Sequence, residues 1–301
     1  MARDLGLPAG FIVNLAHGAS YEYKVYSIAK RTGGRRVIHH PSRRLKALQR
    51  WLLANVVEAL PVHAAAAAYR KNRSIFDNAE LHAKSRYLLR MDLTEFFPSI
   101  TQTDLASYIA EHETLFGGWT HLDVDVFCRL VCRNSTLTIG SPTSPALSNA
   151  ICYQMDVSLH ALSTKSAVTY SRYADDLFFS SNGPDVLRRI EAEVERVVSE
   201  VKVPAKLRIN TTKTRHSSKR GARRVTGIVL GSDGCTYIGR AYKRRIRALI
   251  HKFDSLDQPT RASLVGLIAY AIGFDPQFMN CLIDKYGLDA VRKAAIALAP
   301  K

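Results

Sequence analysis

Acidic residues, cysteines and long apolar segments are all scarce in this sequence of 301 residues. No apolar run approaches the length of a membrane span, and the first residues lack the apolar core of a signal peptide. The five cysteines are odd in number and scattered, and Cys128 and Cys132 have no second ligand pair. These absences exclude a regular disulfide framework and favour buried free thiols over a zinc site. We therefore predict a cytoplasmic protein that does not bind a membrane.

Positive charge is in large excess. Lys and Arg total 43 against 26 Asp and Glu, which gives a formal net charge of +17 and an isoelectric point of about 9.8. Much of the excess lies in two segments: Lys202–Arg247 has fourteen basic residues and one acid, and Lys24–Arg50 has nine basic residues and no acid. Such segments predict a polyanionic partner. A membrane surface would attract them too, but residues 240–249 have no broad aromatic or leucine face.

Three carboxylates are notable for the apolar residues around them. Asp175 and Asp176 lie between two apolar runs, residues 167–170 and 177–179, whose alternation predicts two short strands joined by a tight turn. Asp92 ends a further predicted strand over 87–91. An Asp pair in a turn is ordinarily solvated, whereas aromatic neighbours favour acids presented from a buried sheet. If the three acids meet, they repel one another unless divalent cations bind between them, as in a two-metal nucleotidyl-transfer site.

These segments carry a family resemblance. Tyr173–Asp176 and Asp92–Phe97 resemble the Tyr-x-Asp-Asp hairpin and the Asp-x-x-x-Phe-Phe strand of reverse transcriptases. Three further segments are similar to motifs of the retron reverse transcriptases: Asn78–His82, Gly140–Asn149 and Val225–Gly227. The motifs run in family order from about Tyr23 to Gly287, and several short motifs in the right order are far more specific than any one of them.

The resemblance implies a function. Retron enzymes are RNA-directed DNA polymerases that copy part of a cognate structured non-coding RNA into a branched single-stranded DNA, which stays joined to the RNA. Their primer is the 2′-hydroxyl of a guanosine in that RNA. Retron systems generally act in anti-phage defence with a separate effector, which we expect to be another chain. The alternatives are a group II intron-like or diversity-generating reverse transcriptase, or a non-catalytic RNA-binding scaffold of a defence complex.

The predicted elements fit an α+β fold, which the resemblance specifies as a right-hand polymerase with fingers, an antiparallel palm sheet backed by helices, and a helical thumb. We expect helices over 5–20, 105–112, 126–132, 142–162, 186–201 and from 241 to the end. We expect strands over 23–28, 36–38, 87–91, 206–210, 225–230 and 236–238. The expected domains are an N-terminal helix and fingers over 1–85, a palm with interleaved fingers helices over 86–230, and a thumb over 231–301.

The resemblance also implies roles at the catalytic centre. Asp92 and Asp175 are predicted to bridge two Mg²⁺ ions, with Asp176 holding or orienting the second. A lysine thought in the family to protonate pyrophosphate is matched by Lys213. The predicted contacts to the dNTP are Lys30 and Arg36 on the triphosphate, with Arg35 or Arg31 as substitutes, Phe97 as a steric gate against a ribose 2′-hydroxyl, and the small residues Gly140 and Ser141.

Two features of this pocket leave alternatives open. Phe96 and Phe97 cannot both face one way on a regular strand, so one of them is expected in the core. Ile139 stands where the family usually has glutamine, so a hydrogen bond to the nucleotide is lost or replaced. The expected outcome for rate or fidelity stays open.

RNA recognition is predicted for three groups of residues: Asn78 with His82, the run Arg223, Arg224, Val225, Thr226 and Gly227, and the helical residues Lys243, Arg244 and Arg247. His82 has an equal alternative as a satisfied buried histidine. The alternative for Gly227 is a glycine that relieves crowding in a strand.

Overall fold

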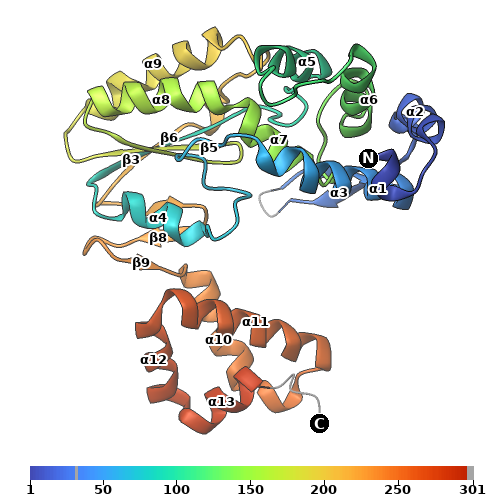
Figure 1. Ribbon diagram of the computed structural model, residues 1–301. Helices are drawn as coiled ribbons and strands as arrows, with labels where there is room; N and C mark the ends of the chain where they lie inside the picture. The colour runs from blue at the N-terminus through green and yellow to red at the C-terminus, as the bar shows by residue number, and fades with distance from the viewer. Residues whose placement is uncertain (31–32, 297–301) are drawn as a thin grey trace. The chain divides into compact units, whose positions relative to one another are not determined.

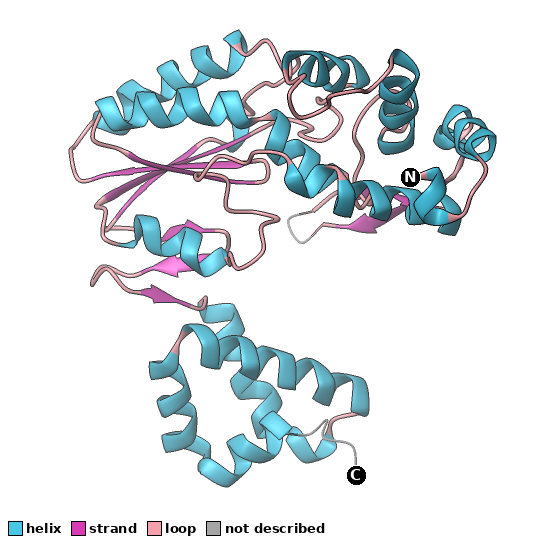
Figure 2. Cartoon of the chain, in the orientation of Figure 1, coloured by secondary structure: helices cyan, strands magenta, loops and turns pink. Residues whose placement is uncertain are grey.

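The computed structural model describes residues 1–30 and 33–296 (Figure 1). The chain divides into two compact units: Met1–Arg73 with Leu89–His216, and Ser74–Leu88 with Ser217–Lys301. Both units combine helices with antiparallel strands, so the predicted α+β fold is confirmed (Figure 2). The division into fingers, palm and thumb stays a prediction. Arg31, the substitute phosphate ligand, lies outside the described residues.

The first unit contains a two-stranded and a four-stranded sheet. Its helices are α1 (Ala2–Leu5), α2 (Ala9–His17), α3 (Arg43–Asn55), α5 (Gln102–Glu111), α6 (His121–Val131), α7 (Ser144–Ile151), α8 (Tyr153–Lys165) and α9 (Val186–Glu200), with 3-10 turns at Ala19–Tyr21, Val57–Ala59 and Thr211–Lys213. Its strands are β1 (Tyr23–Ala29), β2 (Arg35–Pro41), β3 (Tyr87–Asp92), β4 (Thr169–Tyr173), β5 (Asp176–Ser181) and β6 (Arg215–Ser218), of which β3 and β6 are shared with the second unit.

Strands β1 and β2 form the predicted hairpin. They pair antiparallel from Tyr23 opposite Pro41 to Ala29 opposite Arg35, so both strands are longer than expected. The turn contains Gly33 and Gly34 at φ 90° and 80°, a backbone region that residues with a side chain rarely adopt.

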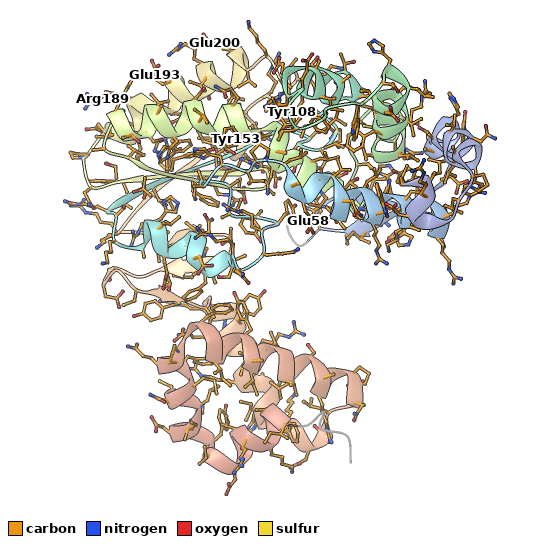
Figure 3. All side chains as sticks on the ribbon, in the orientation of Figure 1. Glu58, Tyr108, Tyr153, Arg189, Glu193 and Glu200 are labelled. Atoms are coloured by element: carbon orange, nitrogen blue, oxygen red, sulfur yellow. The ribbon has the colours of Figure 1, made fainter. Side chains whose placement is uncertain are left out.

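The four-stranded sheet has the order β4-β5-β3-β6 and is backed by helices, as predicted. Helix α8 packs on β4, and α9 packs on β5 and α8 (Figure 1). The sequence of α9 explains this position, because its buried residues recur at helical spacing: Leu187, Ile190, Val194 and Val198. Glu193 and Glu200 lie on the other side of the helix, where both pair with Arg196 (Figure 3).

Two predicted helices are each broken into two. Over residues 5–20 the chain forms α1 and α2, because Gly6 ends α1 at φ 62° and Pro8 precedes α2. A proline also disfavours the helical conformation of the residue before it. Over residues 142–162 the chain forms α7 and α8, which are separated at Cys152, where ψ is 5°.

Two predicted strands are wrong. Residues 206–210 form no regular strand, and Ile209 makes only an isolated bridge with Leu93. Residues 225–230 belong to a hairpin of β7 (Arg223–Val225) and β8 (Ile228–Leu230). Thr226 and Gly227 join these strands at φ 50° and 90°. Two turn residues at positive φ are typical of a type I′ turn, which reverses the chain where one continuous strand was expected.

The second unit contains a three-stranded sheet and a group of helices. Helix α4 (Ile75–Ala83) packs on the sheet, whose order is β7-β8-β9 with β9 at Thr236–Tyr237. The C-terminal helices are α10 (Arg240–His251), α11 (Gln258–Phe274), α12 (Pro276–Tyr286) and α13 (Leu288–Ile296), with a 3-10 turn at Phe253–Ser255. Their core includes Ile246, Leu264, Ile268, Phe278 and Leu282. The prediction of a helical C-terminal region is confirmed as far as Ile296.

The cysteines agree in part with the prediction of buried free thiols. All five are free, but Cys235 and Cys281 are exposed, and the buried three are Cys128, Cys132 and Cys152. Between residues 1 and 296, leaving aside 31 and 32, no helix is long and apolar enough to cross a membrane.

Candidate active site

The structure brings the three predicted carboxylates to neighbouring strand ends. Tyr173 pairs with Asp176, so the β4–β5 turn consists of Ala174, at φ 56°, and Asp175. The backbone carbonyl of Asp175 accepts a hydrogen bond of 2.8 Å from the backbone N–H of Leu93. Because Leu93 directly follows Asp92, this bond fixes the end of β3 beside the turn. Local strand formation and one long-range backbone contact thus gather acids that are far apart in the sequence.

Asp92 is buried and paired with a lysine. The Nζ atom of Lys213 lies 2.8 Å from Oδ1 and 3.0 Å from Oδ2 of Asp92. The backbone N–H of Asn210 donates to the carbonyl of Asp92 at 2.7 Å, which holds the short turn Thr211–Lys213 against the end of β3. The side chain of Lys213 is half exposed, so its ammonium group also faces solvent.

The other two carboxylates differ in their surroundings. Burial raises the pKa of Asp175, and the charge of Asp92 raises it further. Burial also raises the pKa of Asp176, to about 6, against the lowering effect of Arg90. The Arg90 guanidinium lies on Asp176 with Nη2–Oδ1 and Nε–Oδ1 distances of 2.8 and 3.0 Å. Asp92 and Asp176 therefore each have a cationic partner, Lys213 and Arg90. Asp175 instead lies near the negative charge of Asp92.

The three carboxylates of the site are of the ligand type that Mg²⁺ prefers. Among residues 1–30 and 33–296, no three His, Cys, Asp or Glu side chains are arranged to hold a metal ion. Lys213 and Arg90 instead neutralise Asp92 and Asp176. Burial and the negative charge of Asp92 raise the pKa of Asp175, so the ionised form of this carboxyl is unfavourable. A bound divalent cation would stabilise the ionised form. The donor set therefore fits Mg²⁺ in chemical type.

The two phenylalanines after Asp92 separate as the alternation predicts. Phe96 is 5% exposed and lies under the Arg172 guanidinium, so it is the core residue of the pair. Phe97 is partly exposed, with its ring centroid 6.4 Å from that of Tyr69. Burial raises the pKa of Tyr69, and the charge of Asp175 adds to the effect. Phe97 and Tyr69 therefore form an aromatic pair next to the acids.

The β1–β2 hairpin contributes charge near the same site. Burial raises the pKa of Asp175, and the positive charge of Arg36 on β2 partly opposes this effect. Lys30 lies at the hairpin turn, where its backbone N–H donates to Gly34 at 3.0 Å and its side chain is exposed. The triphosphate contacts of Arg36 and Lys30 stay predictions.

The other predicted nucleotide residues pack against β2. Gly140 has φ 112°, and a Cβ atom there would meet the backbone oxygen of His39 at 2.5 Å. A glycine is thus required for the hydrogen bond of 2.8 Å from His39 N–H to Ile139 O. Ser141 is buried, with its hydroxyl 3.0 Å from that of Thr143. Their contacts to a nucleotide stay predictions.

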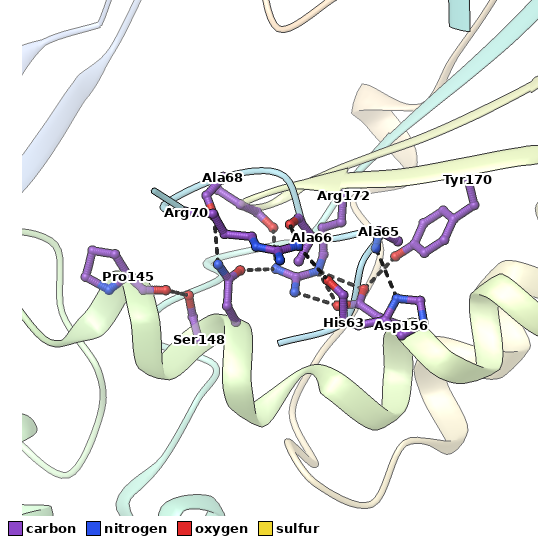
Figure 4. A network of polar contacts seen from close by, with 12 residues as sticks. His63, Ala65, Ala66, Ala68, Arg70, Pro145, Ser148, Asp156, Tyr170 and Arg172 are labelled. Atoms are coloured by element: carbon purple, nitrogen blue, oxygen red, sulfur yellow. Dashed lines mark hydrogen bonds and ion pairs between the residues drawn. The ribbon is translucent and has the colours of Figure 1, made fainter. Parts of the chain in front are cut away.

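A buried ion pair between Arg172 and Asp156, drawn with its polar contacts in Figure 4, is hydrogen-bonded to the turn that carries Asp175. Arg172 and Asp156 are both fully buried, with an Nη2–Oδ2 distance of 2.6 Å. The Tyr170 hydroxyl donates to Asp156 at 2.8 Å, and Arg172 Nη1 donates to the carbonyl of Ala174 at 3.3 Å. Since Ala174 precedes Asp175, this network connects the core to the catalytic turn.

The same network holds the segment before Tyr69. The backbone N–H of Arg172 donates to Ala65 O, and the N–H of Ala67 donates to Arg172 O, both at 2.8 Å. The Asn149 amide donates to Ala68 O at 2.7 Å (Figure 4). Tyr69 follows at φ 61°, a strained region for an aromatic residue, and such strain persists only where the surroundings impose it.

Three of these residues were missed in the sequence. Arg90 had a usable signal, because residues two apart on a strand share a face and Asp92 follows at that spacing. Arg172 is the one charged residue of its strand, Thr169–Tyr173, but nothing in the sequence identifies Asp156 as its partner. Tyr69 lies in an irregular segment without periodicity, so no local pattern indicates it.

The residues predicted to bind RNA all lie in the second unit. Asn78 and His82 are buried on α4, and burial lowers the pKa of His82 to about 3, which keeps it neutral. Arg223 is also buried, and its guanidinium donates to the carbonyls of Ala83, Ser85 and Gly231, so it ties β7 to the end of α4. The RNA-binding role of all three stays a prediction.

The remaining members of this set are more accessible, except Val225, which is buried in β7. Arg224 and Arg244 are exposed. Lys243 pairs with Asp275 at 2.7 Å, and both Lys243 and Arg247 lie over the Phe278 ring. The Thr226 hydroxyl donates to Ile75 O at 3.0 Å, which fixes the turn with Gly227 on the start of α4.

Comparison with known proteins assigns the chain to a family. Residues 28–242 match the family model of the reverse transcriptase (RNA-dependent DNA polymerase). Retron Ec83 reverse transcriptase from Escherichia coli is 35% identical over 289 residues, which cover 94% of this chain and 92% of that protein. Retron Ec73 reverse transcriptase from Escherichia coli is 36% identical over 275 residues, which cover 87% and 86%.

The fold has counterparts among solved structures. Telomerase from Candida albicans, in complex with a fragment of telomeric RNA, superposes with a TM-score of 0.51 at 12% identity, over 91% of this chain and 60% of that one. At this identity the likeness concerns the fold, which is that of a right-hand polymerase. The two retron relatives are similar in sequence over most of this chain, and the chain therefore belongs to the retron reverse transcriptases, which are RNA-directed DNA polymerases.

Proposed function

We propose that this polymerase copies part of a cognate structured non-coding RNA into a branched single-stranded DNA that stays joined to the RNA, and that it does so in anti-phage defence with a separate effector protein. The observation that carries the catalytic part is that Asp92, Asp175 and Asp176 lie at adjacent strand ends. The similarity to retron enzymes over nearly the whole chain supports the RNA-linked product.

The proposed chemistry is a two-metal nucleotidyl transfer with dNTP substrates. Asp92 and Asp175 would hold two Mg²⁺ ions, with Asp176 on or near the second. When bound, the ions lower the pKa of the attacking hydroxyl and neutralise the leaving pyrophosphate. Lys213 lies on Asp92 and supplies a proton for the pyrophosphate. Arg90 neutralises Asp176 and restrains its carboxylate.

Sugar selection is assigned to Phe97. Replacing Phe97 by alanine should increase ribonucleotide incorporation relative to deoxynucleotide incorporation by about tenfold or more, because the ring no longer occupies the space beside the sugar 2′ position. The measurement is single-nucleotide extension with each substrate. Phe11→Ala, at an exposed ring on α2, is the matched control. An unchanged ratio in a folded Phe97→Ala protein would place the gate elsewhere.

RNA recognition in the second unit is assigned to its exposed cations and the β7–β8 turn. Because the guanidinium of Arg223 is buried and bonded to backbone carbonyls, we assign the RNA contact to its exposed neighbour Arg224. Arg224→Gln should weaken initiation on the cognate RNA roughly fivefold at physiological salt, because one phosphate contact is lost. The slope of log affinity for the RNA against log salt concentration should also fall by about 0.7. Extension of a generic annealed primer should change less.

Initiation and extension are measured side by side for Arg224→Gln and for Arg292→Gln, an exposed arginine on α13. Equal losses on both templates would show general primer binding. That result would reject the assignment of cognate-RNA recognition to Arg224.

Primer extension on an RNA template tests the proposed function directly. Incorporation of dNTPs by the purified protein, dependent on Mg²⁺ and on Asp92, is the expected result. Binding of the RNA without any extension would support the non-catalytic scaffold instead.

A further inference from the structure

Tyr69 combines a strained backbone with an exposed ring next to Phe97, the proposed sugar gate. Its φ is 61°, and the residue is 48% exposed. Residues with a bulky side chain rarely adopt this left-handed backbone region, and a half-exposed tyrosine contributes little to a core. Core packing therefore does not explain why the chain holds Tyr69 in this conformation.

The backbone that leads to this tyrosine is held by buried contacts. The N–H of Ala67 donates to Arg172 O and the N–H of Arg172 donates to Ala65 O, both at 2.8 Å, so this segment runs along β4. The Asn149 amide donates to Ala68 O at 2.7 Å, and its Oδ1 accepts a hydrogen bond of 3.1 Å from Arg172 Nη1 (Figure 4). These restraints impose the strained φ on the next residue.

Close packing does not hold the Tyr69 ring on every side. The ring borders a cavity of about 490 Å³, which is also lined by Leu60, Pro142 and Pro145. Its direction depends instead on the backbone, because φ and ψ limit the rotamers that a side chain can adopt. The strained backbone therefore sets where the ring points.

The Phe97 ring has two aromatic neighbours. Its centroid lies 5.5 Å from that of Phe96 and 6.4 Å from that of Tyr69, with an angle of 36° between the Phe97 and Tyr69 rings. Both distances are in the range where aromatic rings attract one another. The backbone of Phe97 is held in a turn, where Ile100 N–H donates to Phe97 O at 3.1 Å, but its half-buried ring can still rotate. Phe96 restrains the ring from the core, and Tyr69 restrains it at the surface.

We propose that Tyr69 is a positioning residue for sugar selection, because its ring holds the Phe97 ring where it excludes a ribose 2′-hydroxyl. The proposal rests on the proposed polymerase function and on the assignment of the sugar gate to Phe97. It requires no contact between Tyr69 and the nucleotide. Arg172 then has two roles, since it is bonded both to the turn that carries Asp175 and to the segment that carries Tyr69.

The test measures the ratio of ribonucleotide to deoxynucleotide incorporation in single-nucleotide extension. Tyr69→Ala should raise this ratio about threefold, which is less than the effect of Phe97→Ala, because the gate ring remains but is less restrained. Tyr69→Phe should keep the wild-type ratio, because the ring contact is retained. General damage to the fold would lower the incorporation of both substrates and would not raise their ratio.

Combining Tyr69→Ala with Phe97→Ala tests how Tyr69 acts. If Tyr69 acts through the Phe97 ring, the double variant should have the same ratio as Phe97→Ala alone, because the two effects are coupled. Tyr21→Ala is the matched control, since it removes a ring that is 92% exposed and should leave the ratio unchanged.

An unchanged ratio for Tyr69→Ala, in a protein whose fold is intact by circular dichroism, would overturn the proposal. A further increase of about threefold in the double variant would also overturn it, because Tyr69 would then act on the nucleotide independently of Phe97. Failure of the wild-type protein to extend a primer with either substrate would instead reject the polymerase function itself, so the two failures are distinguishable.

Discussion

Replacing Asp175 and Asp176 together by asparagine is expected to lower DNA synthesis by more than about a thousandfold, with little effect on fold or RNA binding. Asparagine has nearly the same shape as aspartate but lacks the charge that holds a divalent cation. Removing the charge of Asp175 should not destabilise the folded protein, because burial and the charge of Asp92 already disfavour the ionised form and raise its pKa. Asp92→Asn should have the same effect on synthesis.

The measurement is primer extension by purified variants, with circular dichroism and RNA binding as checks on the fold. Asp284→Asn combined with Asp289→Asn makes the same change of charge at exposed positions and should leave synthesis intact. Substantial extension by the pure Asp175 and Asp176 double variant would remove these residues from the catalytic centre.

Replacing Arg172 by methionine is expected to destabilise the protein by about 3–5 kcal/mol. Both members of the Arg172–Asp156 pair are fully buried, so the substitution leaves the Asp156 carboxylate uncompensated in the core. The same substitution removes the hydrogen bond to Ala174 O and should therefore also reduce DNA synthesis.

Urea denaturation of three variants tests this prediction. Changing both partners, Arg172→Met with Asp156→Leu, should cost less than Arg172→Met alone, because no unpaired charge remains. Arg129→Met breaks a surface pair with Asp125 and should cost at most about 1 kcal/mol. A small cost for Arg172→Met would show that the buried pair contributes little to stability.

The catalytic hairpin could be predicted because its signal is local. Alternating apolar residues on both sides of Asp175 and Asp176 specify two strands and the turn between them, and the structure has both. The spacing of apolar residues likewise predicts α9 and the C-terminal helices. By contrast, the partners of these acids come from elsewhere in the chain. Lys213 reaches Asp92 through an irregular turn, and Arg172 meets Asp156 across two elements.

One of the two wrong strand predictions has a clear physical origin. The apolar residues of the segment 225–230 predict one strand, although Thr226 and Gly227 interrupt them. The structure reverses the chain there because both residues adopt positive φ, and the Thr226 hydroxyl binds Ile75 O from α4. A contact with a distant segment decides the local conformation, and the sequence alone does not reveal that contact.

The nucleic acid that copurifies with the protein tests the central claim most directly. If the chain copies its own structured RNA, the purified protein should carry RNA joined to single-stranded DNA. Ribonuclease should leave a DNA that retains a branched ribonucleotide, and the Asp175→Asn, Asp176→Asn variant should carry only the RNA. DNA of the same length on that variant, or RNA without attached DNA on the wild-type protein, would contradict the account.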